Sequence, residues 1–279
     1  MVSSFFYLAL VLYLIATGGF VVFIIRQEKW VFRISLWFLI AAFAFHTLFL
    51  GIRAYGLGTI PVLDLKSAFS FFSWSVVLIY LIFYRKFRLM VLGAFVAPVA
   101  TLLMVVSSTM RWPETAIGPA FKSAWLVVHI ITIFLGDALF AITFIAAVVY
   151  LVQERQIKTK RLGSIYRRLP SLATLDSINH YSLIYGFPLL TIGMITGSIY
   201  AQLNLGTYWQ WDPKEVWSLI TWLFYAALLH ERLTVGWRGR RAAIMSIICF
   251  AVLLFTFIGA GLWMGGYHSF GNLGLRKAL

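Results

Sequence analysis

Residues 4–25 read SFFYLALVLYLIATGGFVVFII, an uncharged stretch that is long enough to cross the hydrocarbon core of a bilayer as one helix. It has no basic segment before its apolar run and no clear small-residue cleavage site, so we interpret it as a retained span rather than a signal peptide. Seven further apolar stretches follow it, near 31–52, 68–84, 89–107, 121–150, 180–203, 215–231 and 242–264. The sequence therefore predicts an all-α polytopic membrane protein with about eight transmembrane helices.

The composition of the chain supports this fold class. Of its 279 residues, 62% are hydrophobic and 11% are charged, whereas soluble domains are about half apolar and a quarter charged. A soluble enzyme is thereby excluded, and the lipid bilayer is the expected environment. The single cysteine, Cys249, excludes an intramolecular disulfide, a CxxC redox pair and a cysteine-rich zinc site. No stretch is long enough for a large extramembrane domain, so residues 1–279 are expected to form one integral-membrane domain.

The distribution of basic residues predicts an orientation. Sixteen of the 23 Lys and Arg residues lie in the loops that follow the odd-numbered spans, and such a bias marks the cytoplasmic side. Both termini and the loops after the even-numbered spans are then extracytoplasmic. The net charge of +14 is explained without a nucleic-acid partner. Residues 153–179 are expected to form a basic linker at the lipid headgroups, with a short amphipathic helix.

An aromatic loop is the most informative part of the chain. Residues 204–222 read NLGTYWQWDPKEVWSLITW and hold four of the eleven tryptophans. Asp212, Pro213 and Glu215 are typical of the N-cap, first and third positions of a helix, so the seventh span is expected to begin here. The N-terminus of a helix attracts anions, and Lys214 adds a full positive charge.

Tryptophan and tyrosine also accumulate at bilayer interfaces as an aromatic belt, which is the plain explanation for any one of these rings. A belt does not require Tyr208, Trp209, Trp211 and Trp217 to gather beside one polar turn. Such a cluster suits a flat, apolar ligand that carries carboxylates at one edge. Haem, with its propionates, has that shape.

Five histidines are available as ligands, and an imidazole inside a membrane is a functional candidate. His129 lies roughly 12 Å from the outer end of the fifth span at 1.5 Å per residue, and His268 follows the last span on the same side. Two neutral imidazoles can ligate haem iron from opposite faces. By position alone, His46 is expected to hydrogen-bond a neighbouring helix, and His180 and His230 to be interfacial. Whether Asp137 orients a ligand or bonds a hydroxyl stays open.

Several segments resemble the tryptophan-rich WWD signature of the cytochrome c assembly family. They are GFPLLT at 186–191, GTYWQWDPKEVWSLI at 206–220, HER at 230–232 and YHSF at 267–270. Their spacing is closest to the CcsA/ResC-type members, which act in system II cytochrome c biogenesis. Weaker matches extend upstream through His46, Arg53, Pro61 and the stretch 71–74, so the resemblance covers nearly the whole chain.

The resemblance implies a haem b site on the extracytoplasmic face, with His129 and His268 as axial ligands beside the WWD loop at about 204–217. It implies that His230 ligates a second, intramembrane haem, whose opposite ligand comes from a CcsB/ResB-type partner subunit. Haem would be presented there for thioether attachment to the CxxCH segment of apocytochrome c. The activity would be that of a haem–protein lyase (holocytochrome c synthase) shared with the partner, and external proteins would keep the apocytochrome thiols reduced. Such proteins reside in bacterial or plastid-type energy-transducing membranes.

Three other classes of function remain open at this stage. A haem-binding regulator or chaperone would share the signature without attaching haem. A membrane b-haem electron carrier would need histidine pairs on facing helices. A haem-free channel or transporter would be colourless when purified.

Overall fold

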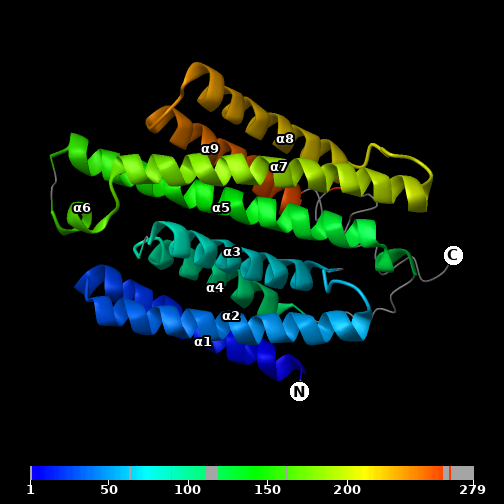
Figure 1. The fold of residues 1–279 in the computed structure, drawn as a ribbon, viewed down its shortest axis with the longest axis horizontal. Helices are drawn as coiled ribbons and strands as arrows, with labels where there is room; N and C mark the ends of the chain where they lie inside the picture. The colour runs from blue at the N-terminus through cyan, green and yellow to red at the C-terminus, as the bar shows by residue number, and fades with distance from the viewer. Residues whose placement is uncertain are drawn as a thin grey trace. The chain divides into compact units, whose positions relative to one another are not determined.

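The computed structural model describes residues 2–62, 64–88, 90–110, 119–160, 163–259 and 264. Each of the eight predicted spans overlaps a helix in it, and residues 260–263 of the eighth lie outside the described residues. Continuous apolar sequence favours helices because a helix satisfies its own backbone hydrogen bonds inside lipid. Along the described residues, the elements are α1 (Val2–Arg26), α2 (Lys29–Leu57), α3 (Leu65–Phe87), α4 (Gly93–Thr109), η1 (Pro119–Lys122), α5 (Ala124–Lys158), α6 (Ser164–Arg168), α7 (Leu172–Leu205), α8 (Pro213–His230), η2 (Glu231–Val235), α9 (Arg240–Leu254) and η3 (Phe255–Gly259) (Figure 1).

The all-α polytopic membrane fold is confirmed. Six helices are long and apolar enough to cross a membrane, namely α1, α2, α3, α5, α7 and α9 with η3, while α4 is a shorter apolar helix. Two spans are longer than predicted, because α5 continues to Lys158 and α7 already begins at Leu172. Helical hydrogen bonding therefore continues into the polar segment 153–179, where the five-residue α6 forms the expected short helix.

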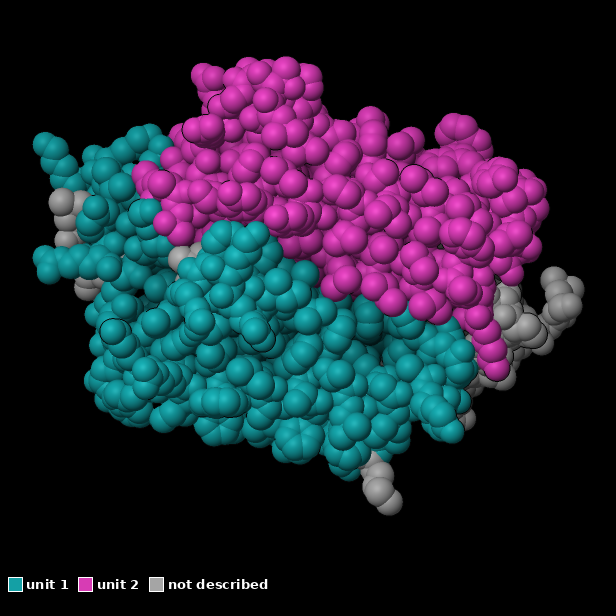
Figure 2. Space-filling view, in the orientation of Figure 1, with its two compact units in different colours: residues 1–113, 153–171 teal, residues 114–152, 172–279 magenta. Residues whose placement is uncertain are grey.

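The helices cluster into two compact units, coloured separately in Figure 2. Unit 1 comprises residues 1–113 and 153–171, and unit 2 comprises residues 114–152 and 172–279, so the division falls within α5. The expectation of a single domain over 1–279 stays a prediction.

Unit 1 is built on two helix pairs, α1 with α2 and α3 with α4, and α1 also packs against α4. Its core is aromatic, and it contains a buried polar centre at His46. The His46 ring lies 3.3 Å from Tyr13 Oη through Nδ1 and 2.9 Å from Ser70 Oγ through Nε2. Three helices are thus joined through one fully buried imidazole, and the expectation that His46 bonds neighbouring helices is confirmed.

Unit 2 holds most of α5 together with α7, α8 and α9, and α5 lies beside α7 (Figure 1). A Cβ on Gly136 would lie 3.2 Å from the backbone nitrogen of Leu190, so glycine lets the two backbones approach. The rings of Phe140 of α5 and Tyr225 of α8 stack with centroids 3.6 Å apart. Hydrogen bonds between hydroxyls, such as Thr221 to Thr256 at 2.8 Å, join α8 to η3. These contacts position the loop before α8.

Candidate functional site

The loop before α8 is shaped by helix ends on both of its sides. Gly206 follows α7 with φ +77, a conformation that glycine adopts without strain. Asp212 is the N-cap of α8, Pro213 is its first residue, and Glu215 completes a capping box. The predicted helix start is therefore confirmed at each of these positions.

Glu215 also organises the loop that precedes the helix. Its Oε2 accepts hydrogen bonds from the backbone N–H groups of Gln210 at 2.8 Å and of Asp212 at 3.3 Å. Between them, Trp211 has φ +58, which is rare for a bulky side chain. Strained backbone of this kind costs about 1–3 kcal/mol and is concentrated at functional sites. The carboxylate of Glu215 thus holds Trp211 in a conformation that the residue does not favour.

The aromatic residues predicted for the site fall into two groups. Tyr208 and Trp211 are 62% and 78% exposed, and the indole of Trp209 meets that of Trp211 edge-on, with centroids 6.0 Å apart. Trp217 instead packs against Phe255 with centroids 4.4 Å apart. Loop aromatics therefore offer accessible ring faces, whereas Trp217 joins α8 to η3.

A positive charge lies at the first turn of α8. The backbone N–H of Lys214 donates to Asp212 Oδ2 at 3.2 Å, and the Lys214 ammonium interacts electrostatically with Asp212 and with the buried Asp137 of α5. Asp137 is thereby linked to the base of the loop rather than to a histidine. An anionic group at this turn would meet both the ammonium and the positive end of the helix.

His129 lies on α5, where it faces α7. Its Nδ1 is 2.7 Å from the carbonyl oxygen of Gly193, and because a carbonyl only accepts, Nδ1 carries the hydrogen and Nε2 the lone pair. This is the tautomer and orientation that metal-binding histidines use. A Cβ on Gly197 would lie 2.7 Å from Nδ1, so glycine provides the space that the ring occupies. Gly197 lies about 12 Å along α7 from Leu205, which places His129 below the loop.

The other predicted ligands are not brought to this place by the described residues. His268 lies outside the residues that the structure describes. His230 ends α8, roughly 25 Å from the loop at 1.5 Å per residue, and its exposed ring lies 3.4 Å from Thr234 Oγ1 through Nδ1. Among the described residues, no cluster of three or more His, Cys, Asp or Glu side chains could hold a metal ion. Binding of iron at the loop would therefore depend on individual histidines from separate segments, and not on a cluster of ligands.

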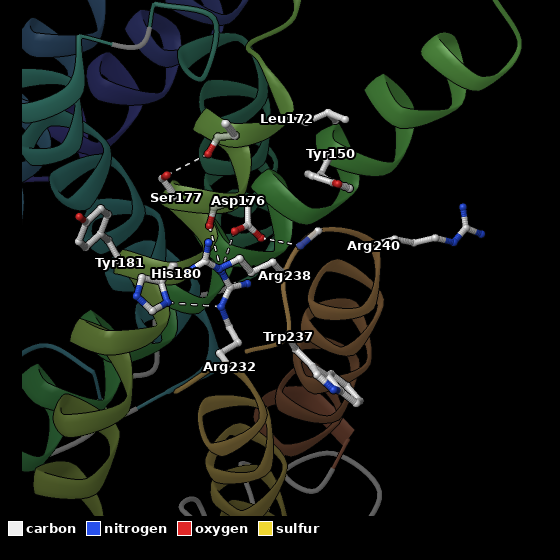
Figure 3. Close-up of a pocket in the computed structure, with 12 residues that line it drawn as sticks. Tyr150, Leu172, Asp176, Ser177, His180, Tyr181, Arg232, Trp237, Arg238 and Arg240 are labelled. Carbon is white, nitrogen blue, oxygen red and sulfur yellow. Dashed lines mark hydrogen bonds and ion pairs between the residues drawn. The ribbon is translucent and has the colours of Figure 1, made fainter. Parts of the chain in front are cut away.

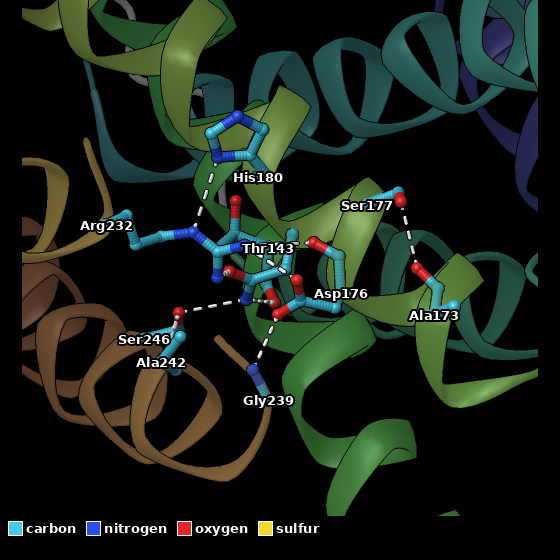
Figure 4. Close-up of polar contacts among 10 residues, drawn as sticks. Thr143, Ala173, Asp176, Ser177, His180, Arg232, Gly239, Ala242 and Ser246 are labelled. Atoms are coloured by element: carbon cyan, nitrogen blue, oxygen red, sulfur yellow. Dashed lines mark hydrogen bonds and ion pairs between the residues drawn. The ribbon is translucent and has the colours of Figure 1, made fainter. Parts of the chain in front are cut away.

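A polar cluster at the opposite end of unit 2 was not predicted (Figure 4). The guanidinium of Arg232 donates to Asp176 Oδ2 at 3.1 Å, to Asn179 Oδ1 at 2.9 Å and to His180 Nδ1 at 3.4 Å. Burial lowers the pKa of Arg232, and the carboxylate of Asp176 partly offsets this effect. His180 is therefore in contact with Arg232, and its expected position at the membrane interface stays a prediction. The available signal was an Asp and an Asn one turn apart in the seven residues before the predicted sixth span.

Comparison with known proteins gives the chain a context. Residues 62–268 match the family described as Cytochrome C assembly protein. The cytochrome c biogenesis protein CcsA of Guillardia theta is 33% identical over 270 residues, which cover 90% of this chain and 89% of that protein. CcsA of Prochlorococcus marinus is 33% identical over 241 residues, which cover 77% of this chain and 76% of that protein.

Solved structures share the fold. Among them is the cytochrome c haem lyase CcmF, with a TM-score of 0.66 and 19% identity. The match covers 99% of this chain and 50% of that one, so the chain spans half the length of this structural relative. At this identity the likeness extends to the arrangement of helices alone.

Proposed function

This chain belongs to the cytochrome c assembly protein family and serves cytochrome c maturation, and from this premise we propose that the loop before α8 receives haem and presents it to apocytochrome c. The observation that carries the proposal is the loop itself. Glu215 holds Trp211 in a left-handed conformation, and the rings of Tyr208 and Trp211 remain exposed. A membrane protein that only needed an aromatic belt would not require a strained backbone to display it.

The residues of the loop fit haem in three respects. The faces of Tyr208, Trp209 and Trp211 offer flat apolar contact to a porphyrin. Lys214 and the positive end of the α8 dipole offer positive charge to propionates, while Pro213 begins that helix and Asp212 and Glu215 fix its first turn. Nε2 of His129 carries the lone pair that an axial ligand needs. In this proposal His268 provides the opposite ligand, and Trp217 supports the loop from η3.

Haem supplies the vinyl groups to which the two thiols of an apocytochrome CxxCH segment add. The chain contributes position: the loop aromatics hold the ring plane, and the imidazoles hold the iron on the extracytoplasmic side. With one buried cysteine, Cys249, the chain has no thiol pair of its own, so external thiol-reducing proteins are expected to prepare the apocytochrome. His230, at the far end of α8, would ligate a second haem together with a CcsB/ResB-type subunit.

Covalent haem on a reporter cytochrome tests the proposal directly. The chain is expressed with and without a CcsB/ResB-type partner in a bacterium that lacks its own maturation system, and haem staining of the reporter is measured. We expect attachment only when both proteins are present. Tight haem binding without attachment in the presence of the partner would instead support a regulator or chaperone.

A matched pair of tryptophan variants tests the role of the loop. Trp211→Ala should lower the haem content of the purified protein several-fold, while Trp37→Ala, which removes an equally exposed ring from α2 of unit 1, should leave it unchanged. Equal haem content in the two variants would indicate that the loop tryptophans are only part of the aromatic belt at the bilayer interface. His268→Ala should lose the bis-histidine absorption spectrum, and added imidazole should restore part of it.

A further inference from the structure

A second site lies at the other end of unit 2, in a pocket of about 610 Å³ (Figure 3). Its lining includes Tyr150 of α5, Asp176, His180 and Tyr181 of α7, Arg232 of η2, residues 237–239 and Arg240 at the start of α9. The pocket has no part in the haem site proposed for the loop, because it lies at the start of α7, whereas the loop follows the end of α7.

The single carboxylate of this pocket is fully used by the protein. Asp176 Oδ2 accepts from Arg232 at 3.1 Å, and Oδ1 accepts from the backbone N–H of Gly239 at 2.9 Å. The negative charge of Asp176 is therefore paired with Arg232. Among the described residues, no other carboxylate lines the pocket.

Arg238 is a second cation of the pocket, and Arg240 at the start of α9 also lines it. The side chain of Arg238 is exposed. Its positive charge lowers the pKa of Arg232 and also acts on His180, so Arg238 lies near both. Among the described residues, no hydrogen bond or ion pair engages its guanidinium. The guanidiniums of Arg232 and Arg238 line one pocket with the single carboxylate of Asp176, which leaves an excess positive charge that an anion would neutralise. Arginine is also the side chain whose planar donors best match phosphate.

The surroundings of the pocket indicate an amphiphilic ligand. Trp237, Tyr150 and Tyr181 line it, and such rings prefer the level of lipid headgroups. Next to it, α7 exposes Tyr181 and Tyr185, and α9 exposes Ile244 and Ile248, which are 38–47% accessible. A molecule with its anionic head at Arg238 would lay apolar chains along these side chains.

We propose that this pocket binds the phosphate headgroup of an anionic phospholipid, with Arg238 as its main contact. Arg240, the first residue of α9, also lines the pocket, so the positive end of this helix lies beside it. Arg232 acts as a positioning residue, because its own donors are engaged by Asp176, Asn179 and His180.

Lipid binding by two arginine variants tests this site. The purified full chain is exchanged into micelles that contain phosphatidylglycerol or phosphatidylcholine, and retained lipid is counted by native mass spectrometry. The chain should retain phosphatidylglycerol in preference to phosphatidylcholine. Arg238→Gln should weaken that retention about tenfold to hundredfold, as expected for lost charged hydrogen bonds. Arg241→Gln removes the same charge from an exposed neighbour that does not line the pocket, and should change retention less than about twofold.

Competition with inorganic phosphate distinguishes a lipid headgroup from free phosphate as the ligand of the pocket. If millimolar phosphate leaves phosphatidylglycerol bound, the ligand is the lipid. If phosphate alone displaces it, the pocket is a soluble-phosphate site and the lipid proposal is overturned. Equal loss in Arg238→Gln and Arg241→Gln, or no preference between the two lipids, would also overturn it. Thermal unfolding midpoints verify that both variants are folded, since both positions are exposed.

Discussion

Two histidines inside apolar helices, His46 in unit 1 and His129 in unit 2, have opposite surroundings. His46 is fully buried, and both of its ring nitrogens meet hydroxyl groups of other helices, on Tyr13 and Ser70. His129 is only partly buried, and its Nδ1 is fixed by a backbone carbonyl. A hydroxyl can donate or accept, whereas a carbonyl only accepts. The carbonyl at Nδ1 of His129 therefore leaves the lone pair on Nε2, where it can bind a metal. The two hydroxyls around His46 instead indicate a structural role.

Replacing His129 should give the largest functional effect. His129→Ala should abolish the bis-histidine spectrum of the outer site, because no other described imidazole of unit 2 lies below the loop. The variant should remain folded, since Gly193 O keeps the hydrogen bond from Thr196 Oγ1 at 3.0 Å. Absorption spectra and thermal unfolding of the same sample measure both effects. An intact spectrum would remove His129 from the site.

The reverse pattern is expected for His46. His46→Ala leaves the hydroxyls of Tyr13 and Ser70 without their shared partner and opens a cavity, so the free energy of unfolding should fall by about 2–4 kcal/mol. Haem content per folded molecule should stay unchanged. Denaturation followed by fluorescence, together with pigment per protein, measures the two quantities. Haem loss without destabilisation would contradict the comparison.

Crowding the ring of His129 should give a smaller effect. Gly197→Ala places a methyl group 2.7 Å from Nδ1, so the ring must turn away from its carbonyl partner, and haem affinity should fall about tenfold, equivalent to one hydrogen bond. Gly18→Ala in α1 provides the control, because nothing lies within 4 Å of the added methyl group. Haem titration of both variants should separate them.

Relieving the strain at Trp211 should give the smallest effect, a slight increase in the stability of the protein. Trp211→Gly removes a side chain from a residue with φ +58, so the protein should gain up to about 1 kcal/mol while its haem content falls. Gln27→Gly, at φ +59 between α1 and α2, should leave haem content unchanged. A loss of stability in Trp211→Gly would indicate that the indole stabilises the fold by packing, instead of being exposed for a ligand.

The sequence predicts the helices well because their signal is local. Apolar length identified the eight spans, and the pattern of Asp212, Pro213 and Glu215 identified the start of α8 to the residue. Contacts between distant segments were beyond its reach. Nothing near Arg232 in the chain reveals that Asp176 and Asn179 of another helix meet its guanidinium, and nothing near Trp217 distinguishes its packing on Phe255 from the exposure of Trp211.

The last turn of α9 is a wide one, since η3 (Phe255–Gly259) has π-helical hydrogen bonding. Such a turn arises when one residue is inserted into a regular helix. Each residue of an α-helix advances the direction of its side chain by about 100°, so this insertion sets the direction in which the side chains of η3 point. Deleting Phe255, the first residue of η3, would turn Thr256 around the helix axis and away from the Thr221 hydroxyl of α8, which it meets at 2.8 Å.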